Sequence, residues 1–254
     1  LILTPHLGAS TAEAQEKVAL QIADQISNYL KTGAISNAVN TFSLSAKEYN
    51  LVKPYLKLSR LLGSFAGQLT ENAIQKIEIE FEGQASKVNT QPIIQTIISS
   101  LLKPTFDNVN IINSMSVAKD KSISVTETKH DRVCEYQSCI TLSITTDKQK
   151  RSVKGTLFGN KPRIVSIKGI KIEAELLKHN LYISNEDKPG FVSNLSKILA
   201  DNNINIATFH LGRKDSGGEA VALISTDNFI DNSVIEKIKK LPLVIQAKYI
   251  TFDD

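Results

Sequence analysis

Cysteine is scarce in this chain: Cys134 and Cys139 are the only two among 254 residues. Two cysteines five positions apart, with no others nearby, are a weak basis for a zinc site or for a disulfide framework. We therefore expect both to be buried, reduced thiols of a cytosolic protein. His130 and Asp131 precede Cys134, but no further ligand residues cluster there. This stretch is interpreted as a polar loop leading to a strand, and no metal site is predicted.

Long apolar runs are also missing. No stretch has the length of a membrane-spanning helix and no signal peptide is found, so we expect a cytoplasmic protein without a membrane partner. The net charge is only +4, from 30 basic and 26 acidic residues. Because the lysines are interleaved with acids, this surplus indicates ordinary solubility and not a nucleic-acid-binding face.

The beginning of the chain has the pattern of a loop that opens a helix. Residues 1–4 (LILT) form a short apolar run typical of a strand end, and residues 5–9 follow as a loop. Ser10 and Glu13 have the spacing of a capping box, in which each side chain satisfies a free amide at a helix start. The sequence therefore predicts that a helix begins directly after this loop.

The predicted helix has one apolar face. Its apolar residues recur every four positions, as Val18, Ile22, Ile26 and Leu30. Gly33 suits the left-handed position that ends a helix. Residues 34–40 (AISNAVN) are expected to form either a short strand or an exit segment.

The loop itself combines groups that suit proton transfer beside an anionic or polarised ligand. Gly8 lets a ligand approach the backbone closely. The helix start offers free amides and a positive dipole end. The His6 imidazole exchanges a proton near pH 7. A structural histidine is the alternative that these residues alone leave open.

A second part, residues 43–176, is expected to be an α+β domain with helices gathered early and strands late. A helical stripe begins near Val52, with Pro54 in its first turn. Alternation over residues 74–83 predicts a half-buried strand, and Pro92 opens another helix. Further strands are predicted in five segments: 109–117, 122–128, 137–145, 152–158 and 163–173.

A third part, residues 177–254, alternates strands and helices in the order βαββαβ, which is the ferredoxin-like arrangement. This order predicts a four-stranded antiparallel sheet with two helices on one face. The bare face and the edges of such a sheet favour pairing with a second copy. The fold class is therefore α+β, with a first part at 1–42, a second at 43–176 and a third at 177–254.

The stretch TPHLGAST, with EAQ after it, an amphipathic helix and then NAVN, resembles the last catalytic motif of the D-isomer-specific 2-hydroxyacid dehydrogenases. Among them it is most similar to the phosphoglycerate dehydrogenases. The resemblance implies that residues 1–42 are the C-terminal remnant of a Rossmann-type catalytic domain. It implies that His6 takes the proton from the substrate hydroxyl as hydride passes to NAD. It also implies that His6, Leu7, Gly8 and Ala9 contact the nucleotide.

Three features of that family are missing. No G-x-G-x-x-G turn occurs, and nothing matches the arginine that clamps the substrate carboxylate or the glutamate that orients the histidine. In the family these features precede the histidine loop. We therefore expect the chain to be the C-terminal piece of a longer enzyme, an expectation with which the missing initiator methionine agrees.

Residues 185–191 (NEDKPGF) offer groups that suit a small amino acid. The helix start after Pro189 and Gly190 supplies amides for a carboxylate. Asp187 can pair with an ammonium group, and Asn205 offers a donor and an acceptor. The alternative is that these are only a turn former and a strand-edge polar residue.

The same stretch resembles an ACT domain, the regulatory module of amino-acid enzymes. The resemblance implies effector contacts at Asn185, Asp187 and Asn205. For an ACT domain of a phosphoglycerate dehydrogenase, the resemblance further implies that L-serine binds between the ACT domains of two paired copies.

Residues 154–174 resemble the closing part of the intervening domain of long-form phosphoglycerate dehydrogenases, which implies an allosteric domain between catalytic and ACT domains. Lys161 and Arg163 would there form an anion site, for a phosphorylated substrate acting as effector. A solvated basic turn is the alternative.

The leading hypothesis is part of an NAD-dependent homo-oligomeric enzyme. It would oxidise 3-phospho-D-glycerate (3-phosphoglycerate) to 3-phosphooxypyruvate in L-serine biosynthesis, with serine-type feedback through the ACT domain. The alternative is a standalone amino-acid-sensing module with a vestigial catalytic loop. Another 2-hydroxyacid dehydrogenase is disfavoured by the long regulatory tail.

Overall fold

The structure is a computed structural model that describes residues 3, 5, 7–33, 35–39, 42–132 and 134–252. The chain divides into two compact units, Leu1–Lys53 and Pro54–Asp254, which are described separately. The boundaries predicted above for three parts stay predictions. None of the helices in the described ranges is both long and apolar enough to cross a membrane.

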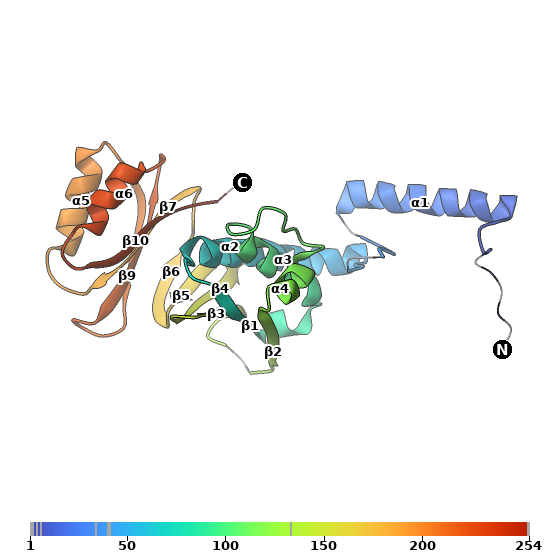
Figure 1. Cartoon of the computed structure of the whole chain (residues 1–254), viewed down its shortest axis with the longest axis horizontal. Helices are drawn as coiled ribbons and strands as arrows, with labels where there is room; N and C mark the ends of the chain where they lie inside the picture. The colour runs from blue at the N-terminus through green and yellow to red at the C-terminus, as the bar shows by residue number, and fades with distance from the viewer. Residues whose placement is uncertain are drawn as a thin grey trace. The chain divides into compact units, whose positions relative to one another are not determined.

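The first unit holds helix α1, Ala12–Thr32 (Figure 1). Its cap is Thr11, whose side-chain oxygen accepts from the Ala14 amide at 3.2 Å. The predicted capping box of Ser10 and Glu13 is therefore wrong. The adjacent Thr11 is the N-cap, and its hydroxyl supplies the hydrogen bond that was expected from Ser10. Gly33 ends the helix at φ 75°, as predicted, and its N–H donates to the Tyr29 carbonyl at 2.7 Å.

The apolar face of α1 is exposed within the described part of the first unit. No residue of this helix is buried, and the four residues of the predicted face have 46–76% of their surface exposed: Val18, Ile22, Ile26 and Leu30. Residues 35–39 contain no strand, so the exit-segment alternative holds there. The predicted strand end at 1–4 lies outside the described residues, apart from Leu3.

Helix α2, Ala46–Leu69, begins earlier than predicted. A capping box does occur here: the Glu48 carboxylate accepts from the Ser45 amide at 2.9 Å, and the Ser45 hydroxyl accepts from the Glu48 amide at 3.3 Å. Because this box starts the helix, Pro54 lies in its interior and not in its first turn. Proline there removes one intrahelical hydrogen bond.

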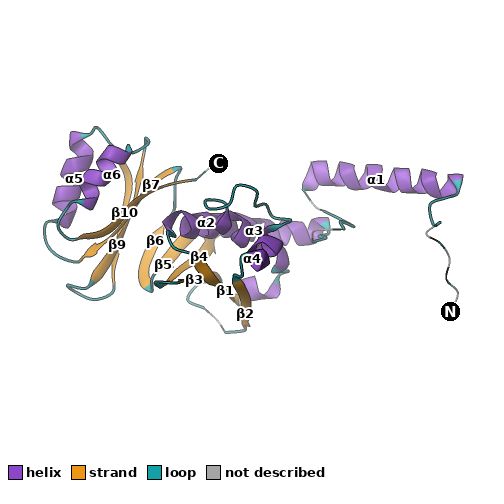
Figure 2. Cartoon of the chain, viewed as in Figure 1, coloured by secondary structure: helices purple, strands orange, loops and turns teal. Residues whose placement is uncertain are grey.

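The part of the second unit that follows α2 holds a six-stranded sheet and further helices (Figure 2). The sheet order is β2-β1-β3-β4-β5-β6. Only β1 and β2 pair in parallel; the other neighbours are antiparallel. The elements are β1 Ile74–Gly83, the short 3-10 helix η1 Gln84–Lys87, α3 Gln91–Leu102, α4 Ser114–Asp120, β2 Ser124–His130, β3 Ser138–Thr146, β4 Lys150–Phe158, β5 Lys161–Ile167 and β6 Ile170–Ala174.

Two of the predicted strands in this part are wrong. Segment 109–117 forms turns and the start of α4, because Asn110 and Asn113 hydrogen-bond backbone amides of this segment. Segment 163–173 is two strands, β5 and β6. The turn between them has Lys168 and Gly169 at φ 53° and 77°, as a two-residue hairpin turn requires.

The last third of the second unit has the predicted order βαββαβ. The elements are β7 His179–Glu186, α5 Phe191–Asp201, β8 Ile206–Arg213, β9 Glu219–Thr226, α6 Asn232–Lys239 and β10 Val244–Thr251. The strands form an antiparallel sheet in the order β10-β7-β9-β8. Both helices lie on one face (Figure 2), over a core that includes Leu181, Ile183, Leu195, Ala222 and Ile224.

The opposite face of this small sheet is not bare, which corrects the prediction. Residues on β7 alternate between the faces, so Tyr182 points away from the helices that cover Leu181 and Ile183. Tyr182 is nevertheless 1% exposed, because its ring packs on Phe65 of α2. The six-stranded part of the same chain covers this face, which leaves the sheet edges for pairing with a second copy.

Candidate functional site

The turn between β7 and α5 holds the residues expected to bind an effector. Asp187 is already engaged there: its Oδ2 accepts from Arg213 Nη1 at 2.9 Å and from the Gly217 amide at 3.3 Å. Its own amide donates to the Gly218 carbonyl at 2.8 Å. The hydrogen bonds from Arg213 and Gly217 lower the pKa of Asp187. The cation beside Asp187 in this chain is therefore Arg213.

Arg213 was not predicted from the sequence. It lies 26 positions from Asp187, at the end of β8, and β8 and β7 both pair with β9. In that register Arg213 is opposite Ala220 and Glu186 is opposite Glu219. The two strand ends therefore meet at the same end of the sheet, which only the sheet order reveals.

Asn185 keeps one polar atom without a partner. The residue is 1% exposed, and its Nδ2 donates to the Glu186 carbonyl at 2.8 Å. Its Oδ1 is buried and accepts no hydrogen bond from any residue that the structure describes. A buried acceptor without a donor is costly, so this atom is suited to a donor from outside the chain.

Asn205 lies far from the other two predicted contacts within one chain. It precedes Ile206, which is opposite Thr226 at the end of β9 that also faces His179. Its Nδ2 donates to Asp227 Oδ2 at 2.6 Å. The distance along β8 from Ile206 to Arg213 is about 23 Å at the usual strand rise. A single ligand cannot touch Asn205 and Asp187 of the same copy.

The start of α5 has free backbone amides, as predicted. Gly190 precedes the helix at φ 97°, and no side chain caps the amides of the first turn. Phe191 and Leu195 hold the helix on the sheet and are 4% and 0% exposed. The tight turn before it is closed by the Lys188 amide, which donates to the Glu186 carbonyl at 2.9 Å.

The predicted anion site at Lys161 and Arg163 lies on β5. Glu175 lies near both cations, with N–O distances of 3.9 Å to Lys161 and 3.6 Å to Arg163. The Arg163 guanidinium lies over the Phe158 ring at 4.7 Å, and its Nε is buried without a partner among the described residues. Burial and the nearby Arg163 charge lower the pKa of His210.

The two cysteines are free thiols. Cys139 is buried as predicted, and burial raises its pKa to about 12, which makes it unreactive. Cys134 is only half-buried, which corrects the prediction for this residue. Its Sγ donates to the Tyr136 carbonyl, because the loop before β3 turns back on itself. No cluster of histidine, cysteine or carboxylate residues able to hold a metal occurs in the part of the chain that the structure describes.

His6 lies outside the described residues, so its predicted catalytic role stays a prediction. Leu7, Gly8 and Ala9 are exposed in the described loop. The loop is closed by the Leu7 amide donating to the Pro5 carbonyl and the Ser10 amide donating to the Leu7 carbonyl. Apart from Gly8 itself and its chain neighbours, no described residue has an atom within 4 Å of where a Cβ of Gly8 would stand, which leaves space for a ligand beside this backbone.

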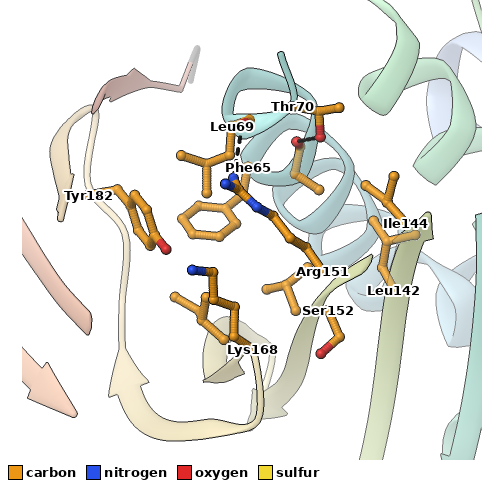
Figure 3. A pocket seen from close by; sticks show the side chains of 12 residues that line it. Phe65, Leu69, Thr70, Leu142, Ile144, Arg151, Ser152, Lys168 and Tyr182 are labelled. Carbon is orange, nitrogen blue, oxygen red and sulfur yellow. Dashed lines mark hydrogen bonds between the residues drawn. The ribbon is translucent and has the colours of Figure 1, made fainter. Parts of the chain in front are cut away.

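A cavity of about 30 Å³ lies beneath β7, against α2, β3 and β4 (Figure 3). Arg151 lies along it, with Nη1 donating to the Leu69 carbonyl at 3.1 Å. Lys168 pairs with Glu219 at 2.5 Å, and the Ser184 hydroxyl donates to the same carboxylate at 2.6 Å. The cavity has room for a water molecule, not for an effector. The Lys168–Glu219 pair joins the turn between β5 and β6 of the larger sheet to β9 of the small one.

The comparisons with known proteins agree with this architecture. The family model of the D-3-phosphoglycerate dehydrogenase intervening domain matches residues 51–168, and the ACT domain model matches residues 179–243. The chain carries a D-3-phosphoglycerate dehydrogenase intervening domain followed by an ACT domain. The resemblance expected from the sequence is thereby confirmed.

Relatives named D-3-phosphoglycerate dehydrogenase are similar to this chain over almost all of its length. The one from Bacillus subtilis is 34% identical and covers 98% of the chain and 48% of its own length. Those from Methanocaldococcus jannaschii and Synechocystis are 32% and 33% identical, and each covers 95% of the chain, with 46% and 44% of their own lengths aligned. The chain spans about half the length of these relatives.

Proposed function

We propose that this chain is part of an NAD-dependent D-3-phosphoglycerate dehydrogenase, which oxidises 3-phospho-D-glycerate to 3-phosphooxypyruvate. The observation that carries the proposal is the similarity to relatives of that name over 95–98% of the chain. The two matched domain models account only for residues 51–168 and 179–243. The aligned length therefore also includes much of the first unit.

In this proposal the loop at the start of the chain is one wall of the reaction site. His6 takes the proton of the substrate hydroxyl, and bound NAD supplies the acceptor for the hydride. Leu7, Gly8 and Ala9 lie against the nucleotide. Their exposed backbone and the open space at Gly8 fit that role. They are not a nucleotide site by themselves, since the sequence has no Gly-rich turn.

The proposed effector is a small amino acid, L-serine, bound between the ACT domains of two copies. Asn185 and Asp187 come from one copy and Asn205 from the other, because the three cannot meet within one chain. The ligand carboxylate lies at the start of α5, where the amides are uncapped. Its ammonium group competes with Arg213 for Asp187. The proposed oligomer uses a sheet edge, since the second face is covered.

Lys161 and Arg163 are proposed to hold the phosphate of a substrate molecule acting as effector. The Arg163 Nε without a partner and the long contacts to Glu175 support this proposal. The pair would gain shorter, charge-assisted bonds from a phosphate than it now has from Glu175.

The test is to join this chain to the nucleotide-binding half of the Bacillus subtilis relative and to measure NADH formation from 3-phospho-D-glycerate. We expect activity in the joined protein and none in the chain alone. An inactive joined protein that folds, together with tight L-serine binding by the chain alone, would favour the standalone sensor. Serine binding is measured by calorimetry on the full chain, with glycine and L-alanine as controls.

A further inference from the structure

A polar hollow of about 440 Å³ lies between α2 and α3, away from the sites described above. On α2 its lining residues stand four positions apart: Arg60, Ser64 and Gln68. On α3 and at the residue that ends it they follow the spacing of one helix face: Thr96, Ser99, Ser100 and Lys103. Each helix therefore turns a single polar row toward the hollow. The end of β10 closes it with Thr251 and Phe252.

The hollow has rigid walls. Next to the polar rows, α2 and α3 pack so closely that a Cβ on Gly63 or Gly67 would overlap a carbonyl of α3. Gln68 fixes the end of β10: its Nε2 donates to the Thr251 carbonyl at 2.8 Å, and its Oε1 accepts from the Thr251 amide at 3.1 Å. A ligand would meet walls already in place, which reduces the ordering cost of binding.

The charges that line the hollow are all positive. Arg60 and Lys103 line it, and no aspartate or glutamate of the described residues does. Within the described ranges neither cation makes an ion pair or a side-chain hydrogen bond, although all four other arginines do. A second hollow of about 420 Å³ shares Arg60 and Phe252 and adds Lys57 and Lys178, so the positive region continues beyond the first.

A serine hydroxyl without a protein partner also lines the hollow. Ser99 is 8% exposed and lines the hollow, yet its hydroxyl has no hydrogen-bond partner among the residues described. Thr96, on the same row, is by contrast satisfied by the Pro92 carbonyl at 2.7 Å. The Ser99 hydroxyl is therefore available to donate a hydrogen bond to a ligand in the hollow.

The C-terminal end of α3 disfavours binding of an anion, because the carbonyl groups at a helix C-terminus carry partial negative charge. Two of these carbonyls are already paired: that of Ser99 accepts from Lys103, and that of Leu102 accepts from Thr105 and Phe106. Two full positive charges outweigh the partial charge that remains.

We infer that this groove between α2 and α3 binds a small phosphate monoester. Arg60 and Lys103 neutralise the phosphate, and Ser99 and Ser100 donate hydrogen bonds to its oxygens. The neighbouring hollow takes the organic part along Leu61 and the other apolar residues that line it, Leu176, Leu177 and Phe252. The inference does not rest on the proposed dehydrogenase activity.

The experiment is calorimetric titration of the full chain with glycerol 3-phosphate, with glycerol as the arm without phosphate. We expect heat from glycerol 3-phosphate only. Arg60→Gln and Lys103→Gln should each weaken its binding by about ten- to hundredfold, the usual effect of losing a charge-assisted bond. Both side chains are exposed, so these variants should fold normally.

Lys87→Gln is the matched control, because Lys87 is an exposed lysine of the same domain outside the groove. It should leave the dissociation constant within about twofold, since a distant exposed charge is screened. Equal weakening by Lys87→Gln would reject a specific site. If Lys161→Gln abolishes binding and Arg60→Gln leaves it unchanged, glycerol 3-phosphate binds at β5 and not in the groove, and the inference is overturned. No heat from glycerol 3-phosphate, or equal heat from glycerol, would also overturn it.

Discussion

The ring of Tyr182 on β7 meets the ring of Phe65 on α2 edge to face, with centroids 6.0 Å apart and planes at 84°. Both residues are 1% exposed. Tyr182 belongs to the ACT sheet and Phe65 to the intervening domain, so the two domains share a core along this contact. The second face of the ACT sheet is part of that core.

Truncating Tyr182 should therefore destabilise both domains together. Tyr182→Ala is expected to lower the free energy of unfolding by about 3–5 kcal/mol, the usual cost of removing a buried aromatic ring. Urea denaturation of the full chain measures it. Tyr182→Phe, which keeps the ring on Phe65, should cost no more than about 1.5 kcal/mol. A small effect of Tyr182→Ala would mean that the domains do not share a core.

Gly212 should tolerate no side chain. A Cβ on this residue of β8 would overlap the Lys171 carbonyl oxygen of β6. Gly212→Ala is expected to lower the free energy of unfolding by about 1–3 kcal/mol, because backbone must move. Gly218→Ala is the control, since its Cβ would meet its nearest atom, the Asp215 carbonyl oxygen, at 3.4 Å. Equal thermal midpoints for the two variants would contradict this.

Glu82 should make stability depend on pH in the acid range. It is 3% exposed and accepts from Arg132 Nε and Lys154 Nζ, both at 2.6 Å. Burial alone raises the pKa of Glu82, but the hydrogen bonds from Lys154 and Arg132 outweigh it and lower the pKa below its ordinary 4.5. The stabilisation is therefore complete above about pH 4.5 and is lost as the pH falls through the lowered pKa.

The variant that tests this is Glu82→Gln, which leaves Lys154 without its carboxylate. It should lower the free energy of unfolding by about 3 kcal/mol at pH 7. The difference from the parent chain should shrink as the pH falls from 7 to 3. Glu135→Gln, which breaks the exposed pair with Lys171, should have a much smaller effect, because solvent screens an exposed ion pair. A difference for Glu82→Gln that does not change with pH would show that the carboxylate charge is not involved.

Arg213 should set the ionisation of the proposed effector site. Arg213→Gln removes the main hydrogen bond that lowers the pKa of Asp187, so this pKa should rise toward its ordinary value. Carboxyl-detected NMR titration measures the change. Lys188→Gln is the control, because Lys188 pairs with Glu186 and not with Asp187. The same Asp187 pKa in both variants would remove Arg213 from this role.

His6→Ala should affect chemistry and not nucleotide binding in the joined enzyme. Loss of a positioned acid/base is expected to lower kcat by about two to four orders of magnitude. The dissociation constant of NADH, from fluorescence titration, should change little. A variant with nearly normal kcat would show that His6 is not the acid/base.

The sequence predicted the elements of the ACT domain well because each carries its own periodicity and a turn signal. It failed where local pattern and side-chain chemistry disagree. Segment 109–117 has strand-like apolar residues, but Asn110 and Asn113 bind backbone amides and start α4. In segment 163–173 the sequence did not reveal the turn between β5 and β6, because lysine, unlike glycine or asparagine, gives no sign of a positive φ at position 168.

The candidate sites were predictable only in part, for a similar reason. Asp187 lies in a recognisable turn, but its partner Arg213 is brought to it by the pairing of β7 and β8 with β9. The covered face of the ACT sheet was missed as well. Tyr182 lies in an apolar run that predicts a strand but does not tell which domain packs on it.

Gly212 also bears on how ACT modules are exchanged between enzymes. At Gly212 the backbone of β8 lies directly against the Lys171 carbonyl of β6, with no space for a side chain between the two domains. An ACT domain transplanted from another enzyme would therefore need glycine at this position. A graft with a side chain there would have to shift backbone to pack on β6, which would destabilise the contact between the domains. Whether a transplanted ACT domain packs on the intervening domain of a chimeric enzyme should then depend more on the residue at this one position than on the overall sequence similarity of the two ACT domains.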